Sequence, residues 1–164
     1  MRVYLRRSVP GLLAILLVVV SCSIALAQDK DPANGTWKLN LSKSKFSPGP
    51  APKELTLTIA SAGPGRKVEV NGVAGDGTPM KWGYSGNFDG KEIRVTGSNP
   101  DADIVMMKRR SPTTTRTTWK KDGKQTVVNG VDVSADGKTL TVAASGVNAK
   151  GQTVKNNFVF DRQQ

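Results

Sequence analysis

The sequence contains no histidine and a single cysteine, Cys22, among its 164 residues. Histidine is the commonest general base and the commonest zinc ligand in proteins, so its absence excludes the most frequent catalytic and zinc sites. A single cysteine cannot form an intramolecular disulfide. The fold must therefore be held together by its hydrophobic core alone.

Carboxylate pairs are the remaining route to acid–base chemistry, and the acidic residues give little sign of one. They stand mainly in turn sequences, where turn formation already explains them: Asp76, Asp89, Asp101, Asp122 and Asp136. No calcium-loop spacing is present either. We therefore predict a protein that is not an enzyme and that holds neither a cofactor nor a metal ion.

Long hydrophobic runs are also scarce. The one apolar run, GLLAILLVVV, is about ten residues long, far fewer than the roughly 20 needed to span a bilayer as a helix. Basic residues (Arg2, Arg6 and Arg7) precede it, and the small-residue sequence Ala25-Leu26-Ala27 follows it. This arrangement predicts a signal peptide over residues 1–27, a mature chain that begins at Gln28, and a periplasmic or secreted location.

The same segment has a second interpretation. Val19-Val20-Ser21-Cys22 resembles a bacterial lipobox, in which the cysteine is lipidated and becomes the new N-terminus. On this alternative the protein is a lipoprotein anchored to a membrane through Cys22. The apolar sequence SIALA after Cys22 and the junction ALAQ favour simple cleavage, and lipidation stays open as the alternative.

Acidic residues are fewer than basic ones, so the net charge is +11. Residues 1–27 hold three of the 24 basic residues and no acidic one, which leaves 21 basic and 13 acidic residues, a charge of +8. A charge of this size attracts anionic surfaces weakly. Because the lysines are scattered over turns and are not interleaved with aromatics, we expect no nucleic-acid site. We expect a monomer with at most weak attraction to anionic envelope surfaces.

No apolar repeat of 3.6 residues long enough for a helix follows residue 34; short runs with period two take its place. Leu55, Leu57 and Ile59, for example, share one face, with Thr56 and Thr58 on the other. This alternation is typical of antiparallel strands with one buried face. Asp-Gly pairs separate several runs, at 76–77, 89–90, 122–123 and 136–137. They predict type I′ hairpins, whose two central residues need a positive φ.

These signals predict an all-β fold, an antiparallel up-and-down meander of about 8–10 strands closed into a barrel, which hides the edge strands. The expected organisation is a signal peptide (1–27), a linker (28–34), one barrel domain (35–162) and a tail (163–164). The proline-rich segment Ser42–Pro52 interrupts the strand pattern. We expect it to lie as a loop over one end of the barrel.

The two ends of the predicted domain carry a family resemblance. Gly35-Thr36-Trp37 opens the first strand, and Arg162 ends the last strand-like run, FVFDR. This pattern resembles the calycins, the lipocalins and fatty-acid-binding proteins, in which a G-x-W tryptophan plugs one end of the barrel under a terminal arginine. The resemblance implies structural roles for Trp37 and Arg162. The opening GTWKLN…SKF also resembles that of small exported bacterial β-rich proteins.

Ligand chemistry is not carried over from that family. The sequence lacks the C-terminal helix of lipocalins and the arginine–tyrosine carboxylate clamp of fatty-acid-binding proteins. Large side chains on different runs are instead the candidate lining of a ligand cavity: Met80, Trp82, Tyr84, Met107, Trp119 and Phe158. Arg116, on a threonine-rich run, is a further candidate: pointing inward it would meet an acidic ligand head, and pointing outward it would be a surface charge.

Two functions follow from this fold. The first is an exported, non-enzymatic binding protein whose barrel holds a small apolar or amphipathic ligand. The alternative is a barrel filled by the same side chains, acting as a structural or surface-interaction protein or lipoprotein of the envelope. The first requires a cavity, and the second requires a packed interior with an exposed apolar patch or a concentrated basic face.

Overall fold

A computed structural model describes residues 31–164 of the chain. The predicted signal peptide, its cleavage after Ala27 and the alternative lipidation at Cys22 lie outside these residues. The described part consists of short antiparallel strands, which are, in chain order, β1 (Gly35–Leu39), β2 (Glu54–Ala62), β3 (Gly65–Val73), β4 (Pro79–Gly86), β5 (Asp89–Arg94), β6 (Thr96–Ser98), β7 (Ile104–Arg109), β8 (Thr114–Lys121), β9 (Lys124–Val133), β10 (Thr139–Val147) and β11 (Thr153–Arg162).

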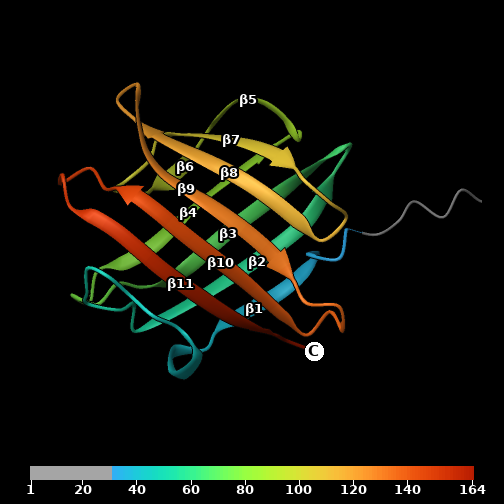
Figure 1. The fold of residues 1–164 in the computed structure, drawn as a ribbon, viewed down its shortest axis with the longest axis horizontal. Helices are drawn as coiled ribbons and strands as arrows, with labels where there is room; N and C mark the ends of the chain where they lie inside the picture. Colours follow the sequence, from blue (N-terminus) through green and yellow to red (C-terminus); the bar gives the residue numbers. More distant parts are fainter. Residues whose placement is uncertain (1–30) are drawn as a thin grey trace, which may run out of the picture.

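The strands form one 11-stranded sheet in the order β5-β7-β8-β9-β10-β11-β1-β2-β3-β4-β6. The sheet curls until β1 pairs with β11, with Trp37 opposite Arg162. Figure 1 shows the resulting barrel, with β7 to β11 in front and β1 to β4 behind. The predicted all-β, up-and-down barrel is confirmed. It has more strands than expected because the segment 89–98 divides into two short strands, β5 and β6.

The barrel is nearly closed, with a seam between β4 and β5. After β4 the chain turns and pairs β5 with β7 instead of with β4, so that β5 and β6 form the two edges of the sheet. The Ile93 side chain covers the seam: a Cβ on Gly86 would lie 2.5 Å from its Cδ1. The Val95 N–H donates to the Asp103 carbonyl at 2.8 Å. The two edges are thus short and partly covered, as exposed edges must be to avoid pairing with other chains.

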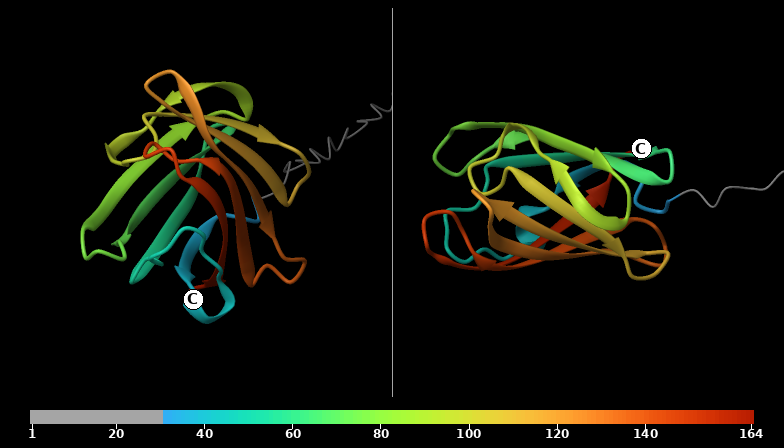
Figure 2. Two further views of the ribbon diagram at one scale, coloured as in Figure 1. Left: turned by 60° about the vertical axis from the view of Figure 1, so that its left-hand side comes forward. Right: turned by 90° about the horizontal axis from the view of Figure 1, so that it is seen from above.

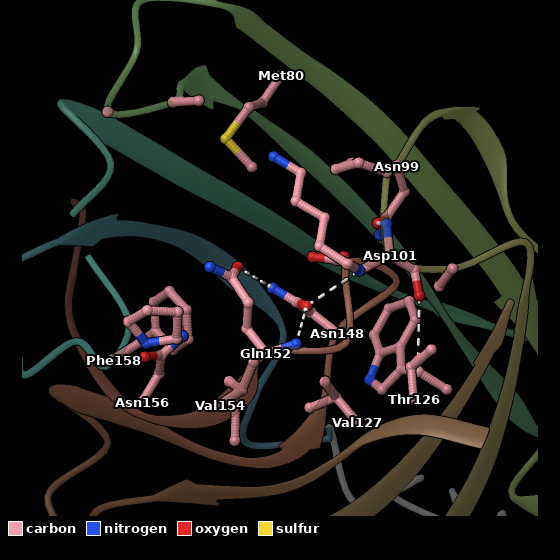
Figure 3. A pocket seen from close by; sticks show the side chains of 18 of the residues that line it. Met80, Asn99, Asp101, Thr126, Val127, Asn148, Gln152, Val154, Asn156 and Phe158 are labelled. Atoms are coloured by element: carbon pink, nitrogen blue, oxygen red, sulfur yellow. Dashed lines mark hydrogen bonds between the residues drawn. The ribbon is translucent and has the colours of Figure 1, made fainter. Parts of the chain in front are cut away.

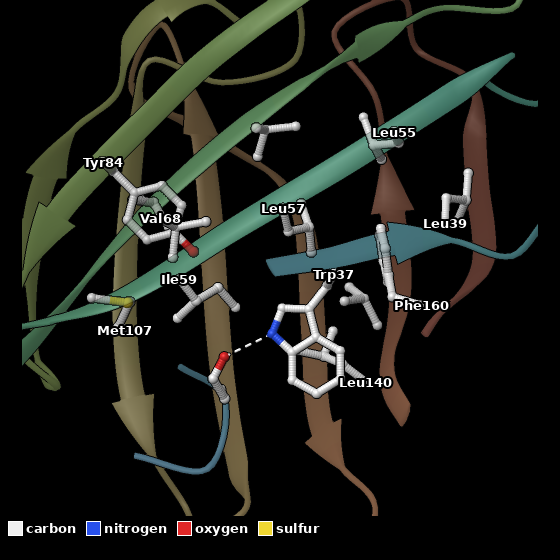
Figure 4. Close-up of a cluster of buried hydrophobic side chains, with 14 of the residues drawn as sticks. Trp37, Leu39, Leu55, Leu57, Ile59, Val68, Tyr84, Met107, Leu140 and Phe160 are labelled. Carbon is white, nitrogen blue, oxygen red and sulfur yellow. Dashed lines mark hydrogen bonds between the residues drawn. The ribbon is translucent and has the colours of Figure 1, made fainter. Parts of the chain in front are cut away.

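The predicted alternation places one face of the longer strands inside. Leu55, Leu57 and Ile59 of β2 are buried, as are Val68 and Val70 of β3. Viewed from above, the strands form two facing walls around this core (Figure 2). Figure 4 shows this core, whose large fully buried side chains include Trp37, Met107, Leu140 and Phe160.

The Asp-Gly turns differ in type from the prediction. Only Asp122-Gly123 has positive φ at both residues, 50° and 75°. At Asp136-Gly137 the glycine alone is positive, at 68°. Its N–H donates to the Ser134 carbonyl three residues back, at 2.8 Å. The prediction of type I′ turns at every pair was wrong. An Asp carboxylate that accepts from the backbone N–H two residues later stabilises a different, three-residue turn equally well.

The proline-rich segment lies as a loop along one end of the barrel, as expected. It starts with a 3₁₀ turn, η1 (Leu41–Lys43). The loop then follows β11, where Lys45 bridges to Asn157 and Phe46 packs edge-on against Phe158 with ring centroids 5.1 Å apart. No helix among residues 31–164 is long and apolar enough to cross a membrane.

Candidate ligand-binding cavity

One end of the barrel is closed around Trp37. Its side chain is fully buried, and its Nε1 donates to the Ala33 carbonyl at 2.8 Å (Figure 4). The Arg162 guanidinium lies 4.1 Å above the indole ring. Gly35 has a φ of 135°, and a Cβ there would lie 2.6 Å from Arg162 Nη1. The G-x-W glycine therefore leaves the space that the arginine needs to cover the tryptophan.

Backbone carbonyls hold this arginine in place. Arg162 Nη1 donates to the Asn34 carbonyl and Nη2 to the Pro32 carbonyl, both at 2.6 Å. Ala33 between them is buried. Residues 31–34 are therefore part of the barrel's closed end, and the predicted linker over 28–34 is corrected for these four residues. These carbonyls satisfy the donors of a guanidinium that is half-buried, as the removal of a charged group from water requires.

A buried ion cluster completes the closed end. Arg66 of β3 donates from Nε and Nη2 to the two carboxylate oxygens of Asp31, at 2.9 Å each. Arg109 of β7 adds a further contact to Asp31 at 2.9 Å, and both guanidinium groups lie over the Phe88 ring. Burial alone would raise the pKa of Asp31, but the charge of Arg66 and the hydrogen bonds from both arginines lower it below its ordinary value.

The opposite end of the barrel opens into a cavity of about 440 Å³. Four turns surround its mouth, around residues 48–50, 74–76, 99–102 and 148–152. Figure 3 looks into this space, where Met80 lies across the opening from Val127 and Val154. The proline-rich loop contributes Pro48 and Pro50 to the mouth. The cavity thus reaches solvent past the loop.

A second, inner lobe of about 120 Å³ continues toward the core. Its wall is mostly aliphatic and includes Leu57, Val70 and Leu140. Tyr84 lies in this lobe, and burial raises its pKa to about 12. The two lobes adjoin through shared wall residues, which are Trp82, Trp119, Asn129 and Phe158.

Three aromatic rings from two strands define the junction. Trp82 packs edge-on against Trp119, with centroids 5.4 Å apart, and stacks on Tyr84 at 6.5 Å. Trp119 Nε1 donates to the Thr117 hydroxyl at 3.0 Å. The junction therefore has flat, rigid apolar surfaces together with a few polar atoms, the composition typical of small-molecule sites.

Charged groups stay at the mouth or are already paired. Asp76 and Asp101 lie beside Lys150 at the opening. The Thr78 N–H and hydroxyl lower the pKa of Asp76. Asp101 accepts from the Ala149 N–H at 3.2 Å. Within the described part of the chain, no three His, Cys, Asp or Glu side chains gather in a way that suits a metal ion.

Of the predicted cavity residues, Met80, Trp82, Trp119 and Phe158 line the outer lobe, and Tyr84 lines the inner one. Met107 is fully buried in the core cluster and lines neither lobe. Arg116 is exposed on the outer face of β8, so its placement in the cavity is corrected. Both faces of this strand are polar, and the inner one is occupied by the buried Thr115 and Thr117.

Three residues of these sites were not predicted from the sequence: Arg66, Arg109 and Asn129. Arg66 shares its face with Val68 and Val70, and Arg109 shares its face with Met107, so the period of two already marks both as inward. Asn129 likewise alternates with Val127 and Val131. The sequence signal that could have identified these residues is a polar side chain at an inward position of an otherwise apolar strand face.

Comparison with known proteins identifies the fold. No family model matches the chain, and no curated protein sequence matches it. The chain is similar to the structure of zebrafish ileal bile acid-binding protein complexed with cholic acid, with a TM-score of 0.50, 11% identity, and coverage of 80% of this chain and 99% of that one. It is also similar to a de novo designed fluorescence-activating β-barrel (TM-score 0.43, 16% identity, coverage 79% and 93%). The first of these shows that the chain shares the fold of a bile acid-binding protein, an antiparallel β-barrel.

Proposed function

We propose that this chain is an exported, non-enzymatic binding protein whose barrel holds a small apolar or amphipathic ligand. The cavity is the observation that carries the proposal. Its outer lobe of about 440 Å³ is within the range of roughly 300–1,000 Å³ that is common for small-molecule sites. Aromatic and aliphatic walls favour an apolar ligand body, and the mouth between the turns gives it a way in.

The alternative, a filled barrel, has less support. It requires that the large inward side chains pack against one another, whereas Met80, Trp82 and Trp119 border open space. It also requires either an exposed apolar patch or a concentrated basic face, and the described residues show no such apolar patch. The large exposed hydrophobic side chains of the described chain are Leu41 and Val147, which stand on separate elements. Scattered single residues of this kind are ordinary for a protein surface.

Binding of N-phenyl-1-naphthylamine, a neutral apolar dye that fluoresces in apolar surroundings, tests the proposal. Ala144 of β10 lines the outer lobe, and Ala143 beside it is exposed on the outer face. We expect Ala144→Trp to fill the lobe and weaken dye binding at least about tenfold, because the cavity volume is lost. The matched Ala143→Trp variant should bind as the unchanged protein does. A protein that binds no dye at all would favour the filled barrel.

A further inference from the structure

Two polar atoms at the junction of the lobes have no hydrogen-bond partner. They are Asn129 Oδ1 and Trp82 Nε1, both buried. Both residues line both lobes. A buried polar atom without a partner costs free energy, and such atoms are rare in folded proteins. A ligand group that forms hydrogen bonds with these atoms is therefore favoured at this place over a purely apolar group.

The surrounding strands place the two residues around the same junction of the lobes. Asn129 of β9 pairs with Thr117 of β8 on one side and with Ala144 of β10 on the other. The Thr117 hydroxyl already accepts from Trp119, whose ring packs edge-on against Trp82. Ala144 is small, so it leaves room beside the Asn129 amide. The junction thus contains a buried acceptor and a buried donor that have no partner within the described protein, in a largely apolar wall.

Among residues 31–164, the inner lobe is lined by no cation that lacks an ion pair. Arg66 is the one positively charged residue of the inner lobe, and its guanidinium is paired with Asp31 through contacts of 2.8 to 2.9 Å. Lys150 lies at the mouth beside Asp76 and Asp101. A carboxylate at the junction of the lobes would lose its hydration without a counter-ion beside it, which is unfavourable in an apolar site.

Building on the proposed function, we propose that the cavity selects neutral amphiphiles that carry a hydroxyl group and discriminates against carboxylates. The hydroxyl hydrogen is donated to Asn129 Oδ1, and the hydroxyl oxygen accepts from Trp82 Nε1. A hydroxyl suits the site because it donates and accepts at once. The alkyl or ring body of the ligand then occupies the outer lobe between Met80 and Phe158.

Displacement of the same dye at pH 7.5 by three ligands of similar size tests this inference. Decan-1-ol donates and accepts, 1-methoxynonane only accepts, and decanoate is charged. We expect decan-1-ol to bind about tenfold more tightly than each of the others, which corresponds to about 1.4 kcal/mol. Decanoate that binds as tightly as decan-1-ol would overturn the selectivity for neutral ligands.

Two variants assign the selectivity to the junction. Asn129→Leu removes the acceptor and should weaken decan-1-ol about tenfold while it leaves 1-methoxynonane within about twofold. Trp82→Phe removes the indole N–H and should weaken both. Asn71→Leu, the same substitution at an exposed position of β3, is the matched control. Melting temperatures of all variants show whether each is folded.

The outcomes separate this inference from the proposed function. If the dye binds and decan-1-ol shows no loss in either the Asn129→Leu or the Trp82→Phe variant, the hydroxyl site is wrong and the binding barrel stands. The two variants are independent, so a failure of one to fold leaves the other as the test. If neither the dye nor any of the three ligands binds, both proposals fail.

Discussion

The role of each arginine depends on whether its side chain lies on the inner or the outer face of its strand. Arg66 points into the barrel and is buried, with its charge neutralised by Asp31 at 2.8 Å. Arg162 lies over Trp37. Arg116, on the outer face of β8, is exposed. The inward arginines are tied to partners that complete the closed end, since a buried guanidinium is tolerated only when paired.

Trp37→Ala tests the closed end at the level of one residue. We expect the variant to lose about 3–5 kcal/mol in the free energy of unfolding, because a fully buried indole is replaced by a cavity and Arg162 loses the ring beneath it. Urea denaturation followed by circular dichroism measures the change.

The control is Trp82→Ala, on the wall of a cavity that already exists, where the loss should be smaller. A loss at Trp37 of less than about 1 kcal/mol would mean that the closed end does not depend on its tryptophan, contrary to the calycin pattern.

Among the elements, the segment 31–34 has no regular secondary structure and yet joins distant strands. Asp31 bonds to Arg66 of β3 and to Arg109 of β7, and Pro32 accepts from Arg162 of β11. Three strands that are not neighbours in the sheet thus converge on four residues of chain. The segment should therefore contribute to the stability of the barrel out of proportion to its length.

This arrangement predicts a specific acid sensitivity. The pKa of Asp31 is lower in the folded than in the unfolded protein, so its ion pairs stabilise the fold fully above the unfolded-state pKa. That contribution is lost as the pH falls from about 4 through the folded-state pKa. We expect the free energy of unfolding, measured by urea denaturation between pH 7 and pH 2.5, to decrease over this window.

Asp31→Asn should cost about 3–5 kcal/mol at pH 7, since Arg66 stays buried without a counter-ion. It should also flatten the acid limb of the stability curve. Asp161→Asn, which removes an exposed ion pair with Lys43, is the matched control and should cost less than about 1 kcal/mol. If the Asp31→Asn variant keeps the full pH dependence of the free energy of unfolding, that dependence comes from other carboxylates.

For the whole molecule, the period of two in the sequence was enough to predict the barrel. Runs such as Leu55, Leu57 and Ile59 leave no doubt about which face is buried, and Gly35-Thr36-Trp37 marks the strand that closes the barrel against Arg162. Local alternation specifies these features, because the order of apolar and polar side chains along a strand decides which of its faces is buried.

The cavity and the ion cluster depended on information that local patterns do not carry. Asp31 and Arg109 are 78 residues apart, and only the closed barrel brings them together. On β8 both faces are polar, so the alternation could not say whether Thr115 or Arg116 points inward. Whether inward side chains meet or leave a space between them is set by the width of the barrel, which the pattern of one strand does not contain.

The location of the protein is testable on the intact molecule. We propose that the chain is exported, and we expect protein purified from the envelope or secreted fraction to have the mass of a chain that begins at Gln28. A mass that fits a lipidated Cys22 as the first residue would support the membrane-anchored alternative. A mass that includes residues 1–27 unmodified would contradict export by either route. Intact-mass spectrometry separates the three.

The pairing of β1 with β11 has a consequence for the order of folding. Arg162 bonds to Pro32 across 130 residues of sequence, and β1 has no partner on that side until β11 has been made. Contacts so distant in sequence form slowly, because the intervening chain must be ordered first. The pairing of β1 with β11 should therefore be the last to form. While the chain is being synthesised, Trp37 lacks the Arg162 guanidinium that covers it in the folded barrel.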